Sequence, residues 1–285
     1  MTKPWRTILF LPASNARAVA KARTLACDAV VLDLEDAVAP EQKADARAAM
    51  VEALHAGGFR APSVIVRVNG LDTEWGEEDL LAAAGAGPDA ILAPKVDDAD
   101  AVRAYDRRIV QAPPRTRLWA MIETCRAALS LREIAEAAAA TRLNGLVAGV
   151  NDLAKEMRAR PGADRAPLVP ALAATVQAAR IGGLVAIDGV CNALEDDVQL
   201  ERESRQGRDL GFDGKSLIHP RQIEIVGRAF SPSPDELAWA RAVVEAFARP
   251  ENADRGALRV DGHMVERLHR VEAERILAAA GAALI

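Results

Sequence analysis

The sequence is poor in cysteine, in concentrated positive charge and in long uncharged apolar stretches. Cys27, Cys125 and Cys191 lie far apart without a CxxC pair, so we expect three reduced core thiols rather than disulfides or a zinc site. The net charge of −5 is spread along the 285 residues, which argues against a nucleic-acid partner. An apolar run begins too early for a signal peptide, and no stretch suits a bilayer, so we predict a cytoplasmic protein without a membrane partner.

Several local signatures of common enzymes are also missing. The chain has no GxGxxG after its first apolar run, no HExxH and no GxSxG, which argues against dinucleotide binding, zinc proteolysis and serine hydrolysis. The tripeptide Gly214-Lys215-Ser216 resembles the end of a P-loop, but Asp209 stands where the first glycine of that motif belongs. The four histidines have no metal-binding spacing and are interpreted as structural or exposed; they are His55, His219, His263 and His269.

Half of the residues are apolar, which is enough for one large core. Short apolar or β-branched runs alternate with longer helix-forming stretches, as in βα units on a parallel sheet. None of the runs alternates polar with apolar residues, so both faces of the sheet should be buried. There are eight runs, at residues 7–11, 29–34, 63–68, 90–94, 118–122, 145–150, 184–187 and 211–217. Eight runs favour an α/β fold with a closed (β/α)8 TIM barrel over a doubly wound sheet, with the active site at the carboxyl ends of the strands.

The character of the sequence changes after Phe230. The segment SPSPDE is typical of a helix start, and two helical stretches follow it, separated by the Gly-, Asn- and Asp-containing residues 250–262. We therefore predict a catalytic barrel over residues 1–230 and a C-terminal helical extension over residues 231–285.

Acidic residues and an arginine end the second and third predicted strands. Asp33, Glu35 and Asp36 would be costly to bury without cations nearby, and Arg67 should point to the same rim. One interpretation is structural: an ion pair between Arg67 and this cluster, with Asp36 capping the next helix. The other is that the planar guanidinium of Arg67 holds an anionic oxygen of a substrate.

Two further carboxylates follow the fifth and sixth predicted strands, Glu123 and Asp152. Because the ends of barrel strands share one rim, we expect both to bind one Mg²⁺, which commonly uses one or two carboxylates and leaves its other positions to water and substrate. Asp152 could instead, or also, cap the helical stretch that follows it. Lys95 could form a Schiff base, but an imine lyase would not need this pair, so Lys95 is expected to pair with rim carboxylates.

Taken in order, the segments at the strand ends resemble the citrate lyase beta subunit-like, CoA ester lyase branch of the HpcH/HpaI aldolase/citrate lyase superfamily. The resemblance covers nearly the whole chain. It rests on RTILFLP (6–12), DLEDAVAP (33–40), RVNG (67–70), APKV (93–96), IET (122–124), DL (152–153), AIDGV (186–190) and GFDGKSLIHP (211–220). It implies a (β/α)8 barrel with Mg²⁺ as cofactor.

The resemblance implies a carbon–carbon lyase that cleaves a 3-hydroxy-3-carboxyacyl thioester into a 2-oxo acid and an acyl thioester. Citramalyl-CoA, malyl-CoA and citryl thioesters are such substrates. Glu123 and Asp152 would hold Mg²⁺, and Arg67 would bind the 2-oxo acid end of the substrate. Glu35 and Asp36 would position metal-bound water.

The same resemblance implies the remaining substrate contacts. Backbone amides of Gly149, Val150, Asn151 and Asp152 would receive the substrate carboxylate. Arg17 and Lys21, near the end of the first strand, would contact CoA phosphates.

The resemblance also gives the C-terminal residues 250–285 a role as a lid over a neighbouring subunit's site in a homotrimer or hexamer. The family's lid often reads Asp-Gly-Lys-Met-Ile/Val-Asp, and its last aspartate transfers a proton. This chain has Asp261-Gly-His-Met-Val-Glu266. The extra methylene of Glu266 changes the reach of that carboxylate, and His263 replaces a lysine that could contact CoA phosphate.

Two alternative functions stay open at this point. One is a 4-hydroxy-2-oxo acid aldolase of the same superfamily that acts without a thioester. The other is a non-catalytic thioester-binding subunit, or a beta subunit that works only with an acyl-carrier partner in a citrate lyase complex. The sequence does not distinguish citramalyl, malyl, methylmalyl and citryl substrates, because these differ by small groups in one pocket.

Overall fold

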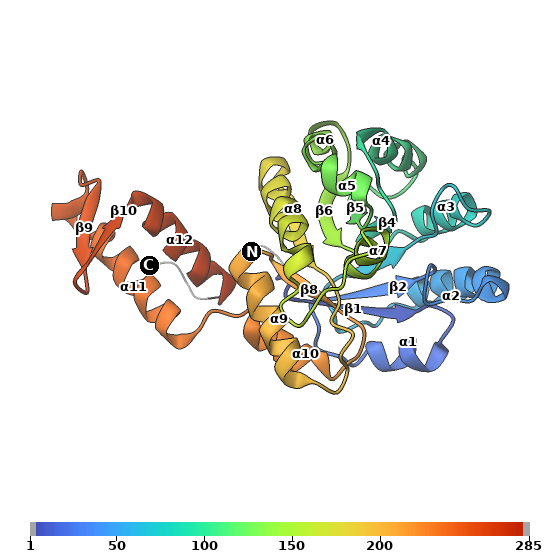
Figure 1. The fold of residues 1–285 in the computed structure, drawn as a ribbon, viewed down its shortest axis with the longest axis horizontal. Helices are drawn as coiled ribbons and strands as arrows, with labels where there is room; N and C mark the ends of the chain where they lie inside the picture. Colours follow the sequence, from blue (N-terminus) through green and yellow to red (C-terminus); the bar gives the residue numbers. More distant parts are fainter. Residues whose placement is uncertain (1–3, 282–285) are drawn as a thin grey trace. The chain divides into compact units, whose positions relative to one another are not determined.

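The computed structural model describes residues 4–281 and divides the chain into two compact units (Figure 1). The larger unit is Trp5–Phe230, and the smaller one is formed chiefly by residues 231–281. Each unit has its own core of buried apolar side chains.

Eight parallel strands close into a barrel in chain order, which confirms the predicted (β/α)8 fold. They are β1 (Thr7–Pro12), β2 (Ala29–Asp33), β3 (Val64–Arg67), β4 (Ala90–Ala93), β5 (Arg117–Ile122), β6 (Leu143–Ala148), β7 (Val185–Asp188) and β8 (Gly214–Leu217). Each strand lies within a few residues of its predicted run. The runs are apolar because one face packs inside the barrel and the other against the helices.

Helices surround the barrel, as Figure 1 shows. They are α1 (Ala16–Ala22), α2 (Lys43–Ala56), α3 (Gly76–Ala86), α4 (Ala99–Arg108), α5 (Cys125–Leu129), α6 (Leu131–Glu136), α7 (Val150–Glu156), α8 (Val169–Gly182), α9 (Asp197–Leu210) and α10 (Gln222–Ala229). Of the three cysteines, Cys27 and Cys191 are buried as predicted. Cys125 is only half-buried, because it begins the short helix α5 at the edge of the core.

The barrel interior is filled by large apolar side chains. Trp119 belongs to this interior cluster and is almost fully buried, with its ring 4.9 Å from that of Trp5 in an edge-to-face arrangement. Gly145 on the neighbouring strand is needed there, because a Cβ at that position would lie 2.7 Å from the Trp119 ring. Side chains therefore fill the barrel toward the amino ends of its strands, and the cavity described below lies at the carboxyl ends.

Strand β8 shows the alternation of side chains that orders the wall. Lys215 points outward, where its ammonium contacts Asp188 of β7 and Glu203 of α9. Ser216, the next residue, points into the cavity at the top of the barrel. Neighbouring residues of one strand thus serve different layers of the fold.

The smaller unit is a pair of helices with a β-hairpin. Helices α11 (Pro234–Ala248) and α12 (Arg267–Ala279) pack together, and β9 (Ala257–Val260) pairs antiparallel with β10 (His263–Glu266). The predicted helix start is confirmed, since Ser233 and Glu236 form a capping box. The hairpin was not predicted. Its turn is Asp261-Gly262, with φ of 48° and 84°, which suits a two-residue turn with both residues left-handed.

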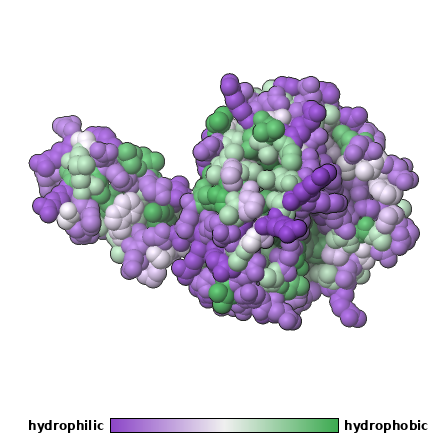
Figure 2. All heavy atoms as spheres, in the orientation of Figure 1, coloured by the Kyte–Doolittle hydropathy of each residue, from purple (hydrophilic) through white to green (hydrophobic). Residues whose placement is uncertain are grey.

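Hydrophilic side chains cover most of the barrel face shown in Figure 2, with apolar areas between them. Among large apolar side chains, Leu129 is 91% exposed and Val110 69%. Within residues 4–281, no helix combines the length and the hydropathy that a membrane crossing requires.

Candidate active site

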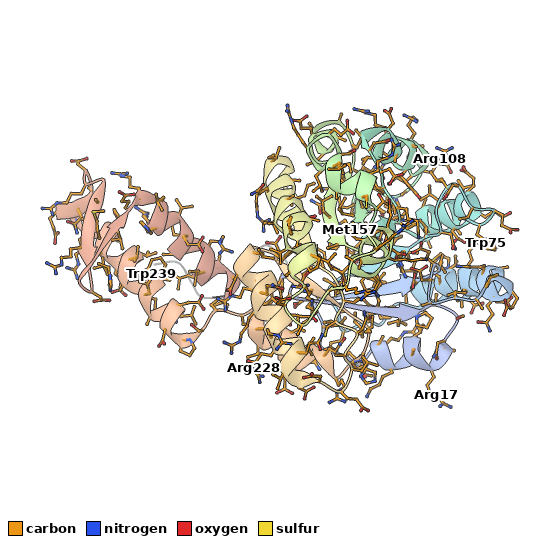
Figure 3. The ribbon with its side chains drawn as sticks, in the orientation of Figure 1. Arg17, Trp75, Arg108, Met157, Arg228 and Trp239 are labelled. Carbon is orange, nitrogen blue, oxygen red and sulfur yellow. The ribbon has the colours of Figure 1, made fainter. Side chains whose placement is uncertain are left out.

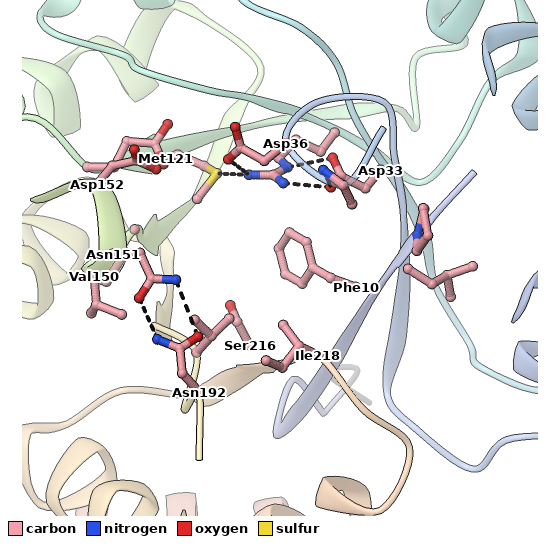
Figure 4. Close-up of a pocket in the computed structure, with 18 residues that line it drawn as sticks. Phe10, Asp33, Asp36, Met121, Val150, Asn151, Asp152, Asn192, Ser216 and Ile218 are labelled. Atoms are coloured by element: carbon pink, nitrogen blue, oxygen red, sulfur yellow. Dashed lines mark hydrogen bonds and ion pairs between the residues drawn. The ribbon is translucent and has the colours of Figure 1, made fainter. Parts of the chain in front are cut away.

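A cavity of about 350 Å³ lies at the carboxyl ends of the barrel strands (Figure 4). Seven of the predicted site residues line it, namely Asp36, Arg67, Glu123, Gly149, Val150, Asn151 and Asp152. The chain brings them together because every β-strand of a closed parallel barrel delivers its carboxyl end to the same rim.

Arg67 is buried among carboxylates at the end of β3. It donates from Nε to Oδ1 of Asp33 at 2.7 Å and from Nη2 to Oδ2 of the same carboxylate at 2.6 Å. Its Nη1 lies 2.8 Å from Oε2 of Glu35, an ion pair without hydrogen-bond geometry, and 3.4 Å from Oδ2 of Asp36. Burial opposes its charge, but the surrounding carboxylates hold the pKa of Arg67 above its usual value. Of the two interpretations of Arg67, the structural ion pair with this acidic cluster is confirmed, and the substrate-binding interpretation stays a prediction.

Hydrogen bonds from the buried side chain of Lys43 hold the acidic turn after β2 in place. Its Nζ donates to the carbonyls of Leu34 and Glu35, both at 2.8 Å, and to Oδ1 of Asn69 at 2.7 Å. Asp36 is 59% exposed and caps no helix, since α2 begins at Lys43 with Gln42 at its N-cap. The predicted capping role of Asp36 is therefore wrong, and its carboxylate faces the cavity instead.

Lys95 links two of the acidic residues. Its Nζ donates to Oε1 of Glu35 at 2.5 Å and lies 4.0 Å from Oε1 of Glu123, so the predicted pairing with rim carboxylates is confirmed. Its backbone N–H also donates to Oε1 of Glu123 at 2.8 Å. This second contact needs a left-handed backbone at Lys95, with φ of 47°, which is uncommon for a residue other than glycine.

Glu123 is 1% exposed, and its Oε2 has no hydrogen-bond partner among the described residues. Burial, and then the charge of Glu35, raise the pKa of Glu123 to about 7. The carboxylate fits closely over β6, because a Cβ on Gly149 would lie 2.3 Å from the Cβ of Glu123. A buried carboxylate oxygen without a donor is a ligand position for a cation.

Asp152 lies in the first turn of α7 and lines the same cavity as Glu123. The N-cap of α7 is Gly149, and no side chain caps this helix, so the predicted capping role of Asp152 is wrong. Within residues 4–281, no three His, Cys, Asp or Glu side chains are grouped to hold a metal. A cation here would be held by this pair of carboxylates, with water and substrate completing its shell, as suits Mg²⁺.

The backbone N–H groups of the turn into α7 differ in whether they are free to donate a hydrogen bond to a ligand. The N–H of Gly149 donates to the carbonyl of Ile122 at 2.9 Å and continues the sheet pattern. The first bond of the helix runs from Leu153 to the carbonyl of Gly149 at 3.1 Å. The N–H groups of Val150, Asn151 and Asp152 precede that bond, so they are the donors that this turn can offer to an anion.

The remaining predicted residues lie away from the cavity. Arg17 and Lys21 are exposed one turn apart on α1, and Figure 3 shows Arg17 projecting from its helix. Neither lines the cavity. Glu266 belongs to the smaller unit, where it ends β10 and is the N-cap of α12, and its N–H donates to Nδ1 of His269 at 2.9 Å.

The structure also shows polar residues of the cavity that the sequence reasoning missed. Asn151 and Asn192 bind each other through their side-chain amides, at 2.7 and 3.4 Å. Ser216 is 2% exposed, and its Oγ has no partner among the described residues. Ser216 could have been predicted to face the cavity, because side chains of a strand alternate between its two faces and residues 214–217 lie in a predicted strand.

A second buried charge cluster lies outside the cavity, between β7, β8 and α9. Asp188 accepts from Nη1 of Arg165 at 2.8 Å and from Nζ of Lys215 at 2.9 Å. Lys215 also lies 3.6 Å from Glu203. Burial alone would raise the pKa of Asp188, but Lys215 and Arg165 hold it below its usual value. This cluster was not predicted. It holds β7 and β8 to α9 and lines no part of the cavity.

The combination of an eight-stranded barrel, a carboxylate pair and a buried arginine agrees with the sequence comparison. The model of the HpcH/HpaI aldolase/citrate lyase family matches residues 6–220. The chain belongs to this family. Its relatives support the citrate lyase beta subunit-like, CoA ester lyase branch of the HpcH/HpaI family, as the strand-end segments predicted.

Two curated relatives of this HpcH/HpaI enzyme differ in name. The "(3S)-malyl-CoA thioesterase" of Cereibacter sphaeroides (strain KD131 / KCTC 12085) is 48% identical over 98% of this chain and 95% of the relative. The "Citrate lyase subunit beta" of Escherichia coli (strain K12) is 35% identical over 93% of this chain and 89% of the relative. Both are similar along most of their length.

Solved structures of the family are also similar. Protein CitE from Mycobacterium tuberculosis, in complex with magnesium, acetoacetate and coenzyme A, has a TM-score of 0.80 and 32% identity, covering 98% of each chain. The citrate lyase beta subunit of M. tuberculosis, complexed with oxaloacetate and magnesium, has a TM-score of 0.68 and 31% identity, covering 80% of this chain and 98% of that one.

Proposed function

We propose that this enzyme is a Mg²⁺-dependent carbon–carbon lyase that cleaves a 3-hydroxy-3-carboxyacyl thioester into a 2-oxo acid and an acyl thioester. The observation that carries the proposal is the buried, unpartnered Oε2 of Glu123 in one cavity with Asp152 and Arg67. The names of the relatives, malyl-CoA thioesterase and citrate lyase subunit beta, support a malyl- or citryl-type acyl group.

Glu123 and Asp152 would hold the magnesium ion, which several structural neighbours contain. When bound, Mg²⁺ supplies a Lewis acid for the carboxylate and hydroxyl oxygens of the substrate. The amides of Val150, Asn151 and Asp152 would bind the same substrate carboxylate. Gly149 shapes this turn and leaves room for Glu123, while its own amide is already bonded within the barrel.

Arg67 stabilises the negative charge that grows on the substrate hydroxyl oxygen as its proton leaves. Asp36, at the cavity wall, orients the water that accepts this proton, and Glu35 positions Arg67 and Lys95 from behind. The carbon–carbon bond then breaks, and its electron pair passes into the thioester as an enolate. Glu266 from a neighbouring subunit would protonate the enolate carbon to give the acyl thioester.

The proposal extends to the oligomeric state, the cellular location and the CoA contacts of the enzyme. We infer a cytoplasmic homotrimer or hexamer in which residues 250–285 close over a neighbour's cavity; residues 282–285 of this segment lie outside the described structure. Arg17 and Lys21 would contact CoA phosphates, supported by their exposure on one face of α1 after β1. Three free cysteines support a reducing compartment.

The test is a panel of citramalyl-CoA, malyl-CoA, methylmalyl-CoA and citryl-CoA assayed with and without Mg²⁺. The proposal expects release of a 2-oxo acid that stops when EDTA removes the metal. Cleavage of free 4-hydroxy-2-oxo acids, indifferent to CoA, would instead establish the aldolase alternative. Mg²⁺-dependent binding without turnover would indicate a subunit that needs an acyl-carrier partner.

Thioester hydrolysis is a second candidate function. It is favoured by four relatives named (3S)-malyl-CoA thioesterase, which are 46–48% identical over 98% of this chain. The same cavity would bind the same substrate, but water would attack the thioester carbon instead of the carbon–carbon bond breaking. Malate and free CoA as products would indicate the hydrolase, whereas glyoxylate and acetyl-CoA would indicate the lyase.

A further inference from the structure

We propose that the Oγ of Ser216 binds the thioester carbonyl oxygen of the substrate and stabilises the negative charge that develops there. The inference rests on the proposed function and deepens it by naming the part of the cavity that receives the acyl group. In the proposed mechanism, no other residue binds the thioester carbonyl oxygen.

Ser216 has a hydroxyl that no protein group satisfies within the described structure. The residue is 2% exposed, and its Oγ is buried without a hydrogen-bond partner among residues 4–281. Such a group costs stability when it is left unpaired, so a fold retains it where a bound molecule completes its bonding. Ser216 lines the same cavity as Glu123, Asp152 and Arg67.

The cavity has two chemically different sides. Asp33 and Asp36 lie on one side of the cavity in Figure 4, and Arg67 is paired with both of them, so this side is charged. Ser216 lies across from them beside Asn192 and Ile218, on a side whose polar groups carry no charge. An anionic 2-oxo acid end fits the charged side. A neutral group with one strong acceptor, such as a thioester carbonyl, fits the other.

The order of the strands supports the same orientation. Ser216 on β8 is in register with Ile8 on β1, and β1 leads directly into α1, which carries Arg17 and Lys21. Glu123 and Asp152 follow β5 and β6, which are three and two strands from β8 around the closed barrel and lie farther still from β1. A thioester whose CoA lies along α1 therefore reaches Ser216 before its far end reaches the carboxylate pair.

The chemistry explains why a neutral donor suits this position. In lyase cleavage, the electron pair of the broken carbon–carbon bond moves into the thioester, and its oxygen becomes an enolate oxygen. In hydrolysis, the addition of water to the thioester carbon places charge on the same oxygen. A hydrogen bond from a hydroxyl to that oxygen becomes stronger as the negative charge grows. It therefore stabilises the transition state more than the bound substrate and accelerates either reaction.

The experiment compares Ser216→Ala with Ser204→Ala in the whole 285-residue chain with Mg²⁺. Ser204 is a matched control, because it is equally buried but donates to the carbonyl of Leu200 within α9. The measurements are kcat on the best thioester of the panel, Mg²⁺ affinity, and exchange of the acyl α-protons of acetyl-CoA in D₂O with pyruvate present. Ser216→Ala should lower kcat and exchange about 100-fold and leave Mg²⁺ affinity unchanged. Ser204→Ala should keep the wild-type rates.

The melting temperature completes the test. Removing an unpaired hydroxyl should leave the melting temperature of Ser216→Ala equal to or above that of the wild type. Wild-type rates in Ser216→Ala would overturn the inference while the lyase or hydrolase assignment stands, and so would a large fall in its melting temperature. A wild-type enzyme inactive on every thioester would instead overturn the proposed function and this inference with it.

Discussion

Arg67 donates two parallel hydrogen bonds to the single carboxylate of Asp33, at 2.7 and 2.6 Å. This fork fixes the guanidinium plane and leaves Nη1 beside the Sδ of Met121 at the cavity, 3.7 Å away. A lysine cannot make this planar pair and reach the cavity at the same time. The position of the positive charge therefore depends on arginine, and on Asp33 behind it.

Replacing Arg67 with lysine should test this dependence. We expect Arg67→Lys to lower kcat by about 10²- to 10³-fold, because the charge remains but its fixed orientation is lost. Steady-state rates at saturating Mg²⁺ measure the effect, and circular dichroism checks that the barrel is folded. Near-normal turnover in a folded variant would contradict the role given to Arg67.

Gly149→Ala should weaken magnesium binding without changing either of the two carboxylates that would hold the ion. Its Cβ would lie 2.3 Å from the Cβ of Glu123 and 2.5 Å from Oε2, so the carboxylate has to move. Isothermal titration with Mg²⁺ should show affinity reduced at least about tenfold, as expected when an outer contact of a ligand is lost. Gly85→Ala in α3 is the control, because a Cβ there meets no atom within 4 Å, and it should bind Mg²⁺ normally.

Magnesium affinity should depend on pH through Glu123. Burial raises the pKa of Glu123 to about 7, so protons compete with the cation below that value. Affinity should rise as pH increases toward 7 and then level off. In metal-free protein, the unfolded chain ionises Glu123 near its ordinary value of 4.5, so its contribution to the free energy of unfolding should decline between pH 4.5 and 7. Glu123→Gln should abolish both trends.

The buried ion cluster on the outside of the barrel predicts a large loss of stability. Asp188→Asn leaves Arg165 and Lys215 buried without their shared carboxylate, and we expect a loss of about 3–5 kcal/mol in the free energy of unfolding. Because the folded pKa of Asp188 is lowered, its stabilisation is present above the unfolded pKa and disappears in acid. Urea denaturation measures this. Arg205→Ala, which removes an exposed pair with Glu201, should change stability little.

Glu266 can be tested by charge and by length. Glu266→Gln should lower turnover by about 10²- to 10⁴-fold while Mg²⁺ affinity stays normal, if its carboxylate transfers the proton. Glu266→Asp should retain most activity, since it keeps the acid. Because Glu266 is the N-cap of α12, melting curves are needed for both variants. Normal turnover in Glu266→Gln would exclude it from proton transfer.

The barrel was predictable because its strands are buried on both faces. Such strands are continuous apolar runs, and all eight were located within a few residues of their observed bounds. The meeting of Arg67 with Asp33, Glu35 and Asp36 was also predictable, because β2 and β3 are neighbours and their ends share a rim.

Other features were harder to predict because they depend on backbone conformation or on side-chain direction. Lys95 reaches Glu123 through its N–H in a left-handed conformation that its residue type does not favour. The capping roles proposed for Asp36 and Asp152 were wrong, since the helices begin at other residues. The hairpin around Asp261-Gly262 was overlooked, although Asp-Gly between two short alternating runs is a strong turn signal.

Lys215 and Ser216 are consecutive residues of β8 with opposite surroundings, one in an ionic layer behind the wall and one facing the cavity. A slip of one residue along this strand would exchange them, placing an ammonium in the cavity and removing the partner of Asp188. Insertions or deletions within β8 should therefore prevent both stable folding and substrate binding. Specificity on this strand can therefore be changed by substitutions, which keep the register, and not by a change in the length of the strand.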